Sequence, residues 1–396
     1  MPVGLYLSVP FCRTKCTYCN FASDVFSRAV FERYVDRVCA DIHTTPRVAH
    51  QMGGQLDREV DSLYLGGGTP TVLDSQQLER MFVTVRQNFS LGPETEITVE
   101  CAPGTLTPTV LETLLKCGVN RVSLGVQSLV DQEAASVGRL HRKDTVLDDV
   151  ARLRGAGISN INIDLIAGLP HQTATSWEVS LEAGIGIGAP HVSIYMLEVD
   201  EDSRLGREGI AGGTRYHAHF VPDEELTADL YERACERLQA AGIRQYEISN
   251  FAREGFESRH NLKYWKRQPY VGFGVDAHSM LPALRDDLDA VRFSTPDSLE
   301  QYMSGTPVQR TEITREAALE ETFFLGLRLA RGVNLEQVGA RFGSSVVGQV
   351  GPRIAELVVM NLLERQGDMV RFTSRGRLLS NEVFERFLGC SVTLAG

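Results

Sequence analysis

The stretch VPFCRTKCTYCNFAS, residues 9–23, follows a short apolar run and decides which fold the sequence favours. It holds three cysteines, Cys12, Cys16 and Cys19, and Phe21 stands two positions after the last of them. In a reducing compartment such a cluster more often holds metal than forms disulfides. The chain has eight cysteines. The other five stand singly in apolar or helical surroundings and are interpreted as small buried residues: Cys39, Cys101, Cys117, Cys235 and Cys390.

Around this stretch, short apolar runs alternate with segments of helical periodicity. Six strands are predicted, at residues 4–10, 61–68, 96–101, 121–126, 161–168 and 192–199. The helices predicted between them span residues 28–44, 75–88, 108–117, 144–155 and 175–186. This order indicates an α/β fold with a parallel sheet and right-handed crossovers. Polar and glycine-rich residues follow the strands, at the sheet edge where active sites of such folds lie.

The rhythm changes after about residue 200. A helix at 223–241 and a strand at 245–252 are predicted, and we assign residues 1–290 to a barrel with a C-terminal extension. Residues 291–310 have the Pro, Ser and Gly content of a linker. Residues 311–396 are predicted to form a winged-helix-like α+β domain, with a hairpin or turn in MVRFTSRGRLLS, residues 369–380.

Charge and hydropathy exclude some functions. The net charge of −11 argues against a nucleic-acid backbone as the main ligand, because that binding depends on Lys and Arg. The C-terminal domain is only weakly basic, so we interpret it as a lid or docking domain. No apolar run is long enough to span a bilayer, and no signal peptide is recognised. A cytoplasmic protein is expected.

Three clustered thiols leave several chemistries open. A structural zinc site normally has four protein ligands, so here a distant His or Cys would complete it. A cubane iron–sulfur cluster held by three thiolates has one iron free to bind another ligand. The cysteines could also hold no metal, and spacing alone does not decide between these alternatives.

C-x3-C-x2-C after the first strand, followed by the glycine-rich turn GGGTP at residues 66–70 after the second, resembles the radical S-adenosylmethionine (SAM) superfamily. The resemblance implies a partial (β/α)6 barrel and a [4Fe–4S] cluster on Cys12, Cys16 and Cys19, with SAM on the open iron. Without it, the glycines could simply form a tight turn, and Tyr18 could be a core residue rather than a platform for adenine.

A closer resemblance covers almost the whole chain. YLSVPFCRTKCTYCNF, LYLGGGTPT, VECAPGTL, RVSLGVQS, GRLHR, NIDLIAGLP and QYEISNFAREGFESRHNLKYW are similar, in this order, to the oxygen-independent coproporphyrinogen III oxidase group. No residue is assigned a catalytic role. With Tyr18, the SAM-binding residues that we expect are Tyr6, Gly67, Gly68, Thr69, Glu100, Gln127, Arg139 and Asp164.

Two features separate the branches of this group. The oxidases carry a further cysteine where this chain has Phe21, and the HemW branch has the motif H-N-x-x-Y-W, here residues 260–265. The resemblance to that branch implies a haem chaperone, with His260 as haem ligand and Tyr264 and Trp265 covering the macrocycle. Alternatively, HNLKYW is an ordinary folded segment. The alternative function is oxidative decarboxylation of coproporphyrinogen III.

Three further histidines complete the candidates. His278 is a second candidate near the ligand site, whereas His217 and His219 are interpreted as surface residues. The expected partners are haem as cargo, haem-acceptor proteins including respiratory membrane enzymes, a reductant for the cluster, and a second copy of the chain. Contact with such acceptors would place the protein peripherally at the membrane.

Overall fold

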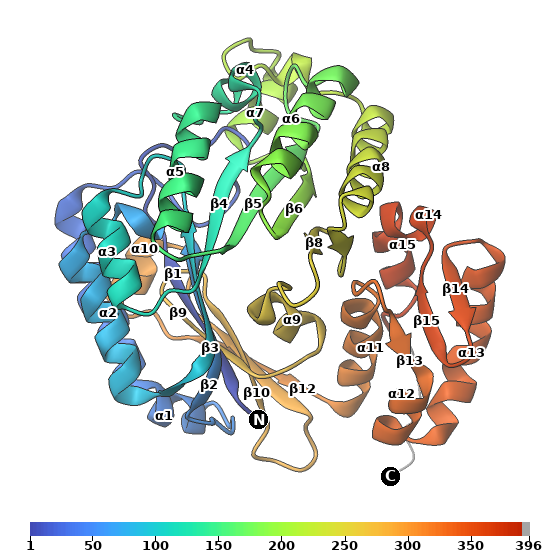
Figure 1. Cartoon of the computed structure of the whole chain (residues 1–396). Helices are drawn as coiled ribbons and strands as arrows, with labels where there is room; N and C mark the ends of the chain where they lie inside the picture. The colour runs from blue at the N-terminus through green and yellow to red at the C-terminus, as the bar shows by residue number, and fades with distance from the viewer. Residues whose placement is uncertain (390–396) are drawn as a thin grey trace.

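The computed structural model describes residues 1–389, and twelve strands within them form one curved sheet (Figure 1). Its order is β12-β11-β10-β9-β1-β2-β3-β4-β5-β6-β8-β7, so the two ends of the sheet do not pair and the barrel is incomplete. Adjacent strands from β1 to β6 are parallel, which confirms the predicted α/β fold. These six strands are β1 (Val3–Val9), β2 (Glu59–Gly67), β3 (Ser90–Cys101), β4 (Arg121–Gln127), β5 (Asn160–Ala167) and β6 (His191–Met196).

Helices connect the parallel strands and cover the outer face of the sheet (Figure 1). They are α1 (Arg28–Gln51), η1 (Pro70–Val72), α2 (Ser75–Asn88), α3 (Pro108–Lys116), α4 (Asp131–Ser136), α5 (Lys143–Gly155) and α6 (Ala174–Ile187). The first helix was expected to end at residue 44 but continues to Gln51, because Thr45 and Ala49 are buried against the core and Pro46 lies on the outer side.

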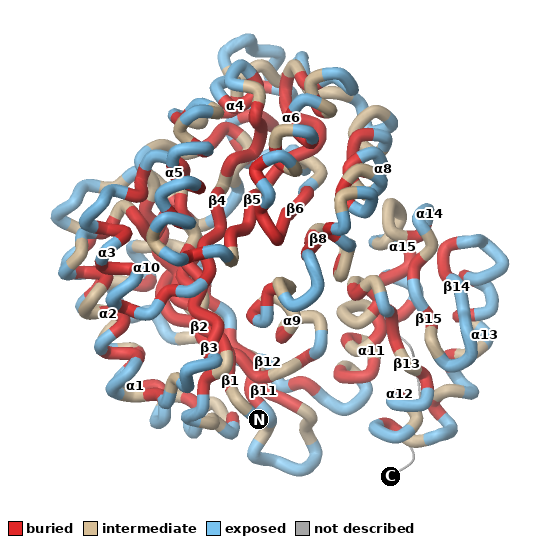
Figure 2. Tube along the Cα trace, viewed as in Figure 1, coloured by how far each residue is buried: buried red, intermediate tan, exposed pale blue. Residues whose placement is uncertain are grey.

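The core lies between the sheet and this helical layer (Figure 2). On β1, Val3, Leu5, Leu7 and Val9 are at most 1% exposed. Full burial of such an aliphatic side chain contributes roughly 1.5–3 kcal/mol each. Because side chains alternate along a strand, the intervening residue Tyr6 faces the inside of the barrel. One face of β1 therefore packs in the core, and the other face lines the inside of the barrel.

The sheet is extended at both edges by mostly antiparallel strands. The helices of this extension are α7 (Arg204–Ala211), η2 (Ala218–Phe220), α8 (Glu224–Ala240), α9 (Arg259–Trp265) and α10 (Leu299–Ser304). Its strands are β7 (Arg244–Gln245), β8 (Asn250–Ala252), β9 (Tyr270–Phe273), β10 (His278–Pro282), β11 (Ala290–Ser294) and β12 (Gln309–Ile313).

Two expectations for this extension differ from the structure. The strand expected at 245–252 is broken into β7 and β8, because the chain turns back between them and the two pair antiparallel. The segment 291–310, expected to be a linker, contains most of β11, all of α10 and the start of β12. Strand β12 is at the edge of the sheet and mostly exposed, and β11 has only five residues, so neither has the long apolar run of a central parallel strand. The boundaries between domains stay a prediction.

The C-terminal elements have the order of a winged helix. Three helices and a short strand precede a β-hairpin, and β13, β15 and β14 form a second sheet. The hairpin strands are β14 and β15, and a helix, α14, replaces the second half of the hairpin expected at residues 369–380. Cys390 and the last residues of the predicted domain lie outside the described part. The elements are α11 (Arg315–Gly326), β13 (Val333–Asn334), α12 (Leu335–Phe342), α13 (Ser344–Val359), β14 (Leu363–Gln366), β15 (Met369–Phe372), α14 (Ser374–Leu378) and α15 (Ser380–Glu385).

A buried ion network joins this module to the sheet. Arg267 donates from Nε to Glu321 of α11 at 2.7 Å and from Nη1 to Asp289 at 3.0 Å. Arg292 of β11 lies 2.7 Å from the other Glu321 oxygen. The side chain of Arg267 is 2% exposed and that of Glu321 7%, so neither charge can be solvated by water if its partner is lost.

In the part of the chain that the structure describes, no helix has the length and apolar character needed to cross a bilayer.

We therefore expect Glu321→Ala to destabilise the protein by about 3–5 kcal/mol, because it removes the carboxylate that Arg267 and Arg292 share and leaves only Asp289 beside Arg267. Chemical denaturation followed by circular dichroism measures this change. The control is Glu79→Ala, which removes an exposed pair with Lys116 and should change stability little. Equal effects of the two substitutions would contradict the structural role of the network.

Candidate functional site

The cysteine loop begins where β1 ends and is tied back on itself. The Cys12 amide donates to the Asp24 carbonyl at 3.0 Å, and the Asp24 amide donates to the Pro10 carbonyl at 3.0 Å. Within the loop, the Cys19 amide donates to the Cys16 carbonyl at 3.3 Å. These bonds hold residues 12–24 as one closed loop at the carboxyl end of the parallel strands.

Each of the three sulfurs has a polar neighbour from its surroundings. Thr69 Oγ1 lies 3.9 Å from Cys12 Sγ, Arg139 Nη1 lies 3.4 Å from Cys16 Sγ, and Ser23 Oγ lies 3.9 Å from Cys19 Sγ. Burial raises the pKa of the Cys12 thiol, and the nearby thiols of Cys19 and Cys16 raise it further. The three thiols therefore lie near enough to influence one another, and each has a polar neighbour; Cys16 is buried, and Cys12 and Cys19 are half-buried.

The glycine-rich turn after β2 packs directly against this loop. The Gly68 amide donates to the Val9 carbonyl at 2.9 Å, and the Thr69 amide donates to the Phe11 carbonyl at 2.8 Å. A Cβ at Gly68 would lie 2.7 Å from both carbonyl oxygens, and Gly67 has a φ of +98°. Only glycine fits this approach. Packing therefore requires the glycines of GGG, and the same residues place no side chain between the backbone and a ligand.

Two carboxylates lie on β3 and β5, the strands on either side of β4. Glu100, near the end of β3, accepts from Tyr64 Oη at 2.8 Å. Asp164, on β5, accepts from Ser123 Oγ at 3.1 Å and from Asn162 Nδ2 at 2.7 Å. Burial raises the pKa of Glu100 to about 7 and also raises the pKa of Asp164. The charge of Arg121 lowers both pKa values, so burial outweighs this cation and the hydrogen bonds.

The end of β4 connects these carboxylates to the cysteine loop. Gln127 has a φ of +70°, and the register with β5 shifts between Gly125 and Gln127. Arg139 donates from Nη2 to the Gly125 carbonyl and from Nη1 to Cys16 Sγ. One guanidinium therefore joins strand β4 to the thiol cluster. Tyr18 packs on the apolar cluster of Val137, Ile166 and Leu169, and its role toward adenine stays a prediction.

The predicted haem ligand lies inside the barrel, on α9. His260 is 1% exposed, its Nδ1 lies 3.0 Å from Ser62 Oγ, and its Nε2 lies 2.9 Å from Tyr264 Oη. Burial lowers the pKa of His260 to about 3, so the imidazole is neutral. The ring stacks near Tyr64, with centroids 5.3 Å apart, and Tyr6 lies next along the row at 6.3 Å. Both ring nitrogens are thus occupied by protein partners.

The remaining candidates lie elsewhere. Trp265 is covered by the guanidinium of Arg328, 4.9 Å from its ring centroid, on the side of the C-terminal module. The His278 side chain is 63% exposed and lies 3.5 Å from Asp276. His219 is exposed as expected, but His217 is half-buried, with Nδ1 3.1 Å from His171 Nε2.

Sequence reasoning missed Tyr64. This residue links two predicted positions, since its hydroxyl donates to Glu100 and its ring packs beside His260. The signal was present in LYLGGG, where Tyr64 has the same parity as Tyr6 in YLSVP, and the two residues are paired in the β1–β2 register. Two tyrosines at matched inward positions of neighbouring strands predict a shared lining.

Comparisons with known proteins identify the family. Residues 6–183 match the model described as the radical SAM superfamily, and residues 313–379 match the model of the HemN C-terminal domain. The chain is 32% identical over 391 residues to the heme chaperone HemW of Lactococcus lactis subsp. lactis, covering 98% of this chain and 97% of the relative. The chain belongs to the HemW family. It is also 34% identical over 390 residues to the heme chaperone HemW of Bacillus subtilis, covering 97% of this chain and 98% of the relative.

A solved structure supports the fold of this HemW family member. The coproporphyrinogen III oxidase HemN from Escherichia coli, described as a radical SAM enzyme, aligns with a TM-score of 0.81 and 23% identity. The alignment covers 98% of this chain and 90% of that chain. At this level of identity the match shows the fold alone, and it agrees with the incomplete barrel described above.

Membership of the radical SAM superfamily implies a [4Fe–4S] cluster and SAM, and the residues present fit both groups. Within residues 1–389, no three His, Cys, Asp or Glu side chains are grouped so that they could hold a single metal ion. A cubane binds each thiolate to a different iron, and three partly buried thiols with polar neighbours suit it. The backbone at Gly67 and Gly68, which carries no side chain, and the half-buried carboxylate of Glu100 suit an amino-acid ligand with hydroxyl and ammonium groups.

We expect Cys12→Ala to lose the iron and sulfide of the reconstituted protein, because two thiolates cannot hold the cluster. Iron and acid-labile sulfide assays, with the absorbance spectrum, measure this loss. Cys39→Ala, which removes a half-buried cysteine of α1, is the control and should retain both. Retention of full iron and sulfide by Cys12→Ala would show that the ligand assignment is wrong.

The raised pKa of Glu100 predicts a pH dependence of the cluster-free protein. Since folding favours the protonated carboxyl, its stabilising contribution is complete below the unfolded pKa of about 4.3 and is lost as the pH rises through about 7. Glu100→Gln should therefore flatten the fall in melting temperature between about pH 5 and 8. Thermal unfolding across this range measures the difference, with exposed Glu94→Gln on the same strand as control. Parallel curves for wild type and Glu100→Gln would refute the prediction.

Proposed function

We propose that this protein is a haem chaperone, which binds haem and transfers it to haem-requiring proteins. The observation that carries the proposal is the near full-length similarity to relatives named heme chaperone HemW, which spans the barrel and the C-terminal module. Phe21 supports it, because the group's oxidases are expected to have a further cysteine at this position. In the structure Phe21 is 66% exposed at the rim of the cysteine loop.

The residues of the site would retain the cofactors of the superfamily. Cys12, Cys16 and Cys19 would hold the [4Fe–4S] cluster, which supplies an electron to SAM when both are bound. Of the SAM-binding residues, the Gly67–Gly68 backbone would bind the amino-acid end, and the carboxylates of Glu100 and Asp164 would accept hydrogen bonds from it and from the ribose. Arg139, bonded to Cys16, would place a positive charge beside the cluster.

The expected partners are haem, acceptor proteins including respiratory membrane enzymes, a reductant for the cluster, and a second copy of the chain. The protein would act in the cytoplasm or peripherally at the membrane.

His260 as haem ligand requires a local change. Its Nε2 is bonded to the Tyr264 hydroxyl, and the side chain is buried. Because an imidazole nitrogen cannot bond a phenol and haem iron at once, Tyr264 would have to turn away before iron binds. A movement of α9 relative to β2 would provide the access.

Haem titration followed at the Soret band tests the function and the ligand separately. We expect stoichiometric binding by the wild type and a loss of at least tenfold in affinity for His260→Ala. Tyr264→Phe frees Nε2 and should bind haem at least as tightly as the wild type.

The outcomes of this titration are distinct. No binding by the wild type would overturn the chaperone proposal, whereas unchanged binding by folded His260→Ala would overturn only the ligand assignment. Circular dichroism checks the fold, since the change leaves Ser62 without its buried partner.

Anaerobic incubation of the reconstituted protein with SAM and coproporphyrinogen III addresses the oxidase alternative. The chaperone proposal predicts no protoporphyrinogen. Its formation at catalytic turnover would establish the oxidase function instead.

A further inference from the structure

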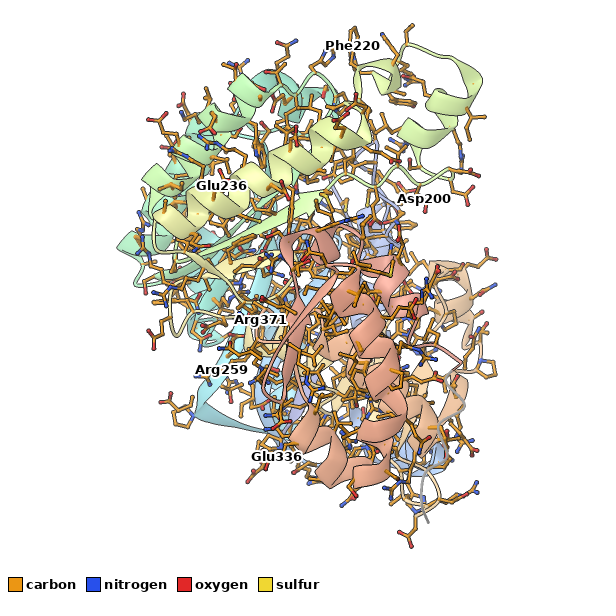
Figure 3. All side chains as sticks on the ribbon, turned by 90° about the vertical axis from the view of Figure 1, so that its right-hand side faces the viewer. Asp200, Phe220, Glu236, Arg259, Glu336 and Arg371 are labelled. Atoms are coloured by element: carbon orange, nitrogen blue, oxygen red, sulfur yellow. The ribbon has the colours of Figure 1, made fainter. Side chains whose placement is uncertain are left out.

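A second hollow lies between α9 and the C-terminal module, away from the cysteine loop. It has a volume of 200 Å³, and its charged lining consists of Lys266, Arg267, Arg331 and Arg341. Among the described residues, no aspartate or glutamate lines it. In Figure 3, where the right-hand side of Figure 1 faces the viewer, the C-terminal elements lie in front of the sheet. The hollow is therefore a positively charged recess at the junction of two parts of the fold.

Buried donors without acceptors gather at this junction. Trp265 Nε1 and Arg267 Nη2, both from residues that line the hollow, are buried and have no hydrogen-bond partner among the described residues. Arg328 Nε, from the guanidinium that lies over the Trp265 ring, is a third such donor. A buried donor left unpaired costs about 1–3 kcal/mol, so each one needs an explanation. A ligand with acceptor oxygens in the hollow would satisfy the donors of Trp265 and Arg267, the two of these residues that line it.

The carboxylates next to the hollow do not neutralise all of the positive charge that lines it. Arg267 donates from Nε to Glu321 and from Nη1 to Asp289, so its Nη2 group remains without an acceptor. Arg341 also bonds to Asp289, at 2.8 Å. Partial burial lowers the pKa of Lys266, and the neighbouring charge of Arg331 lowers it further. The carboxylates of Glu321 and Asp289 thus bond to Arg267 and Arg341. The charge of Glu257 acts on Lys266 but does not offset its burial and the charge of Arg331, so an anion would stabilise Lys266 and Arg331.

We propose that this hollow binds a propionate carboxylate of the haem cargo, with Trp265 Nε1 and Arg267 Nη2 as donors and Lys266 and Arg331 as the neutralising charges. The inference rests on the proposed haem-chaperone function and assigns the group that recognises the cargo. Drug-sized ligands fill pockets of roughly 300–1,000 Å³, so a hollow of 200 Å³ admits a propionate arm but not the macrocycle. The ring would lie outside the hollow, and Trp265 would bind the cargo through its N–H.

Haem and its dimethyl ester distinguish recognition of the carboxylate from recognition of the ring. We expect wild type to bind haem roughly tenfold more tightly than the ester, as loss of a charge-assisted hydrogen bond predicts. Trp265→Phe keeps an aromatic ring but removes the donor, and Arg331→Gln removes a charge from an exposed position. Both should reduce the preference for haem over the ester. Arg267 is avoided because its replacement would also break the ion network with Glu321.

Each outcome decides between the proposals. Arg207→Gln, an exposed arginine of α7, is the control and should keep the tenfold preference. Equal affinities of wild type for haem and ester overturn the inference and leave the chaperone function standing. Absence of binding to either form overturns the chaperone function itself. Inorganic phosphate provides a last arm: if phosphate raises the melting temperature and Trp265→Phe abolishes this effect while the preference for haem stays unchanged, the hollow serves free anions and the assignment to haem is wrong.

Discussion

The close approach of the glycine turn to the cysteine loop is the constraint on which the site depends. Parallel pairing places Val9 of β1 opposite Gly67 of β2. Just beyond this pair, the Gly68 amide donates to the Val9 carbonyl and the Thr69 amide donates to the Phe11 carbonyl. A methyl group at Gly68 would overlap the carbonyl oxygens of Val9 and Phe11. The cysteine loop and the glycine turn are therefore a single unit, whose shape is set by backbone atoms rather than by side chains.

Burial of charge is the second determinant of the site. Glu100 and Asp164 both have raised pKa values, because burial outweighs the hydroxyl and amide donors beside them and the nearby charge of Arg121. A ligand that brings an ammonium or several hydroxyls would complete the compensation and release any proton still bound. The site is thus less stable without a ligand than with one, which is common where binding is the function.

The sequence allows prediction of the parts whose cause is local. The alternation of strands and helices and the burial of β1 follow from apolar periodicity, and the thiol loop and the glycine turn follow from residue type. The contacts of His260 do not, because Ser62 lies 198 positions away and nothing in HNLKYW specifies it. The sequence predicts a linker where β11 forms, because this strand has only five residues and pairs with β10 and β12 through backbone groups that the sequence does not show. The ion network of Arg267 likewise depends on two segments that meet only in the folded chain.

The helix α9 connects the two halves of the proposed function. Its residues His260 and Tyr264 are four positions apart, on one face, and bond to each other beside β2. Trp265 is one position further, about 100° around the helix, and meets Arg328 at the C-terminal module. One short helix therefore carries the proposed iron ligand on one side and the proposed carboxylate donor on another. The start of α9 is capped by Ser258 and by the Glu96 carboxylate, which accepts from the Arg259 and His260 amides. The first turn of α9 is therefore fixed to β3, and the two proposed contacts with the cargo project from the same short helix.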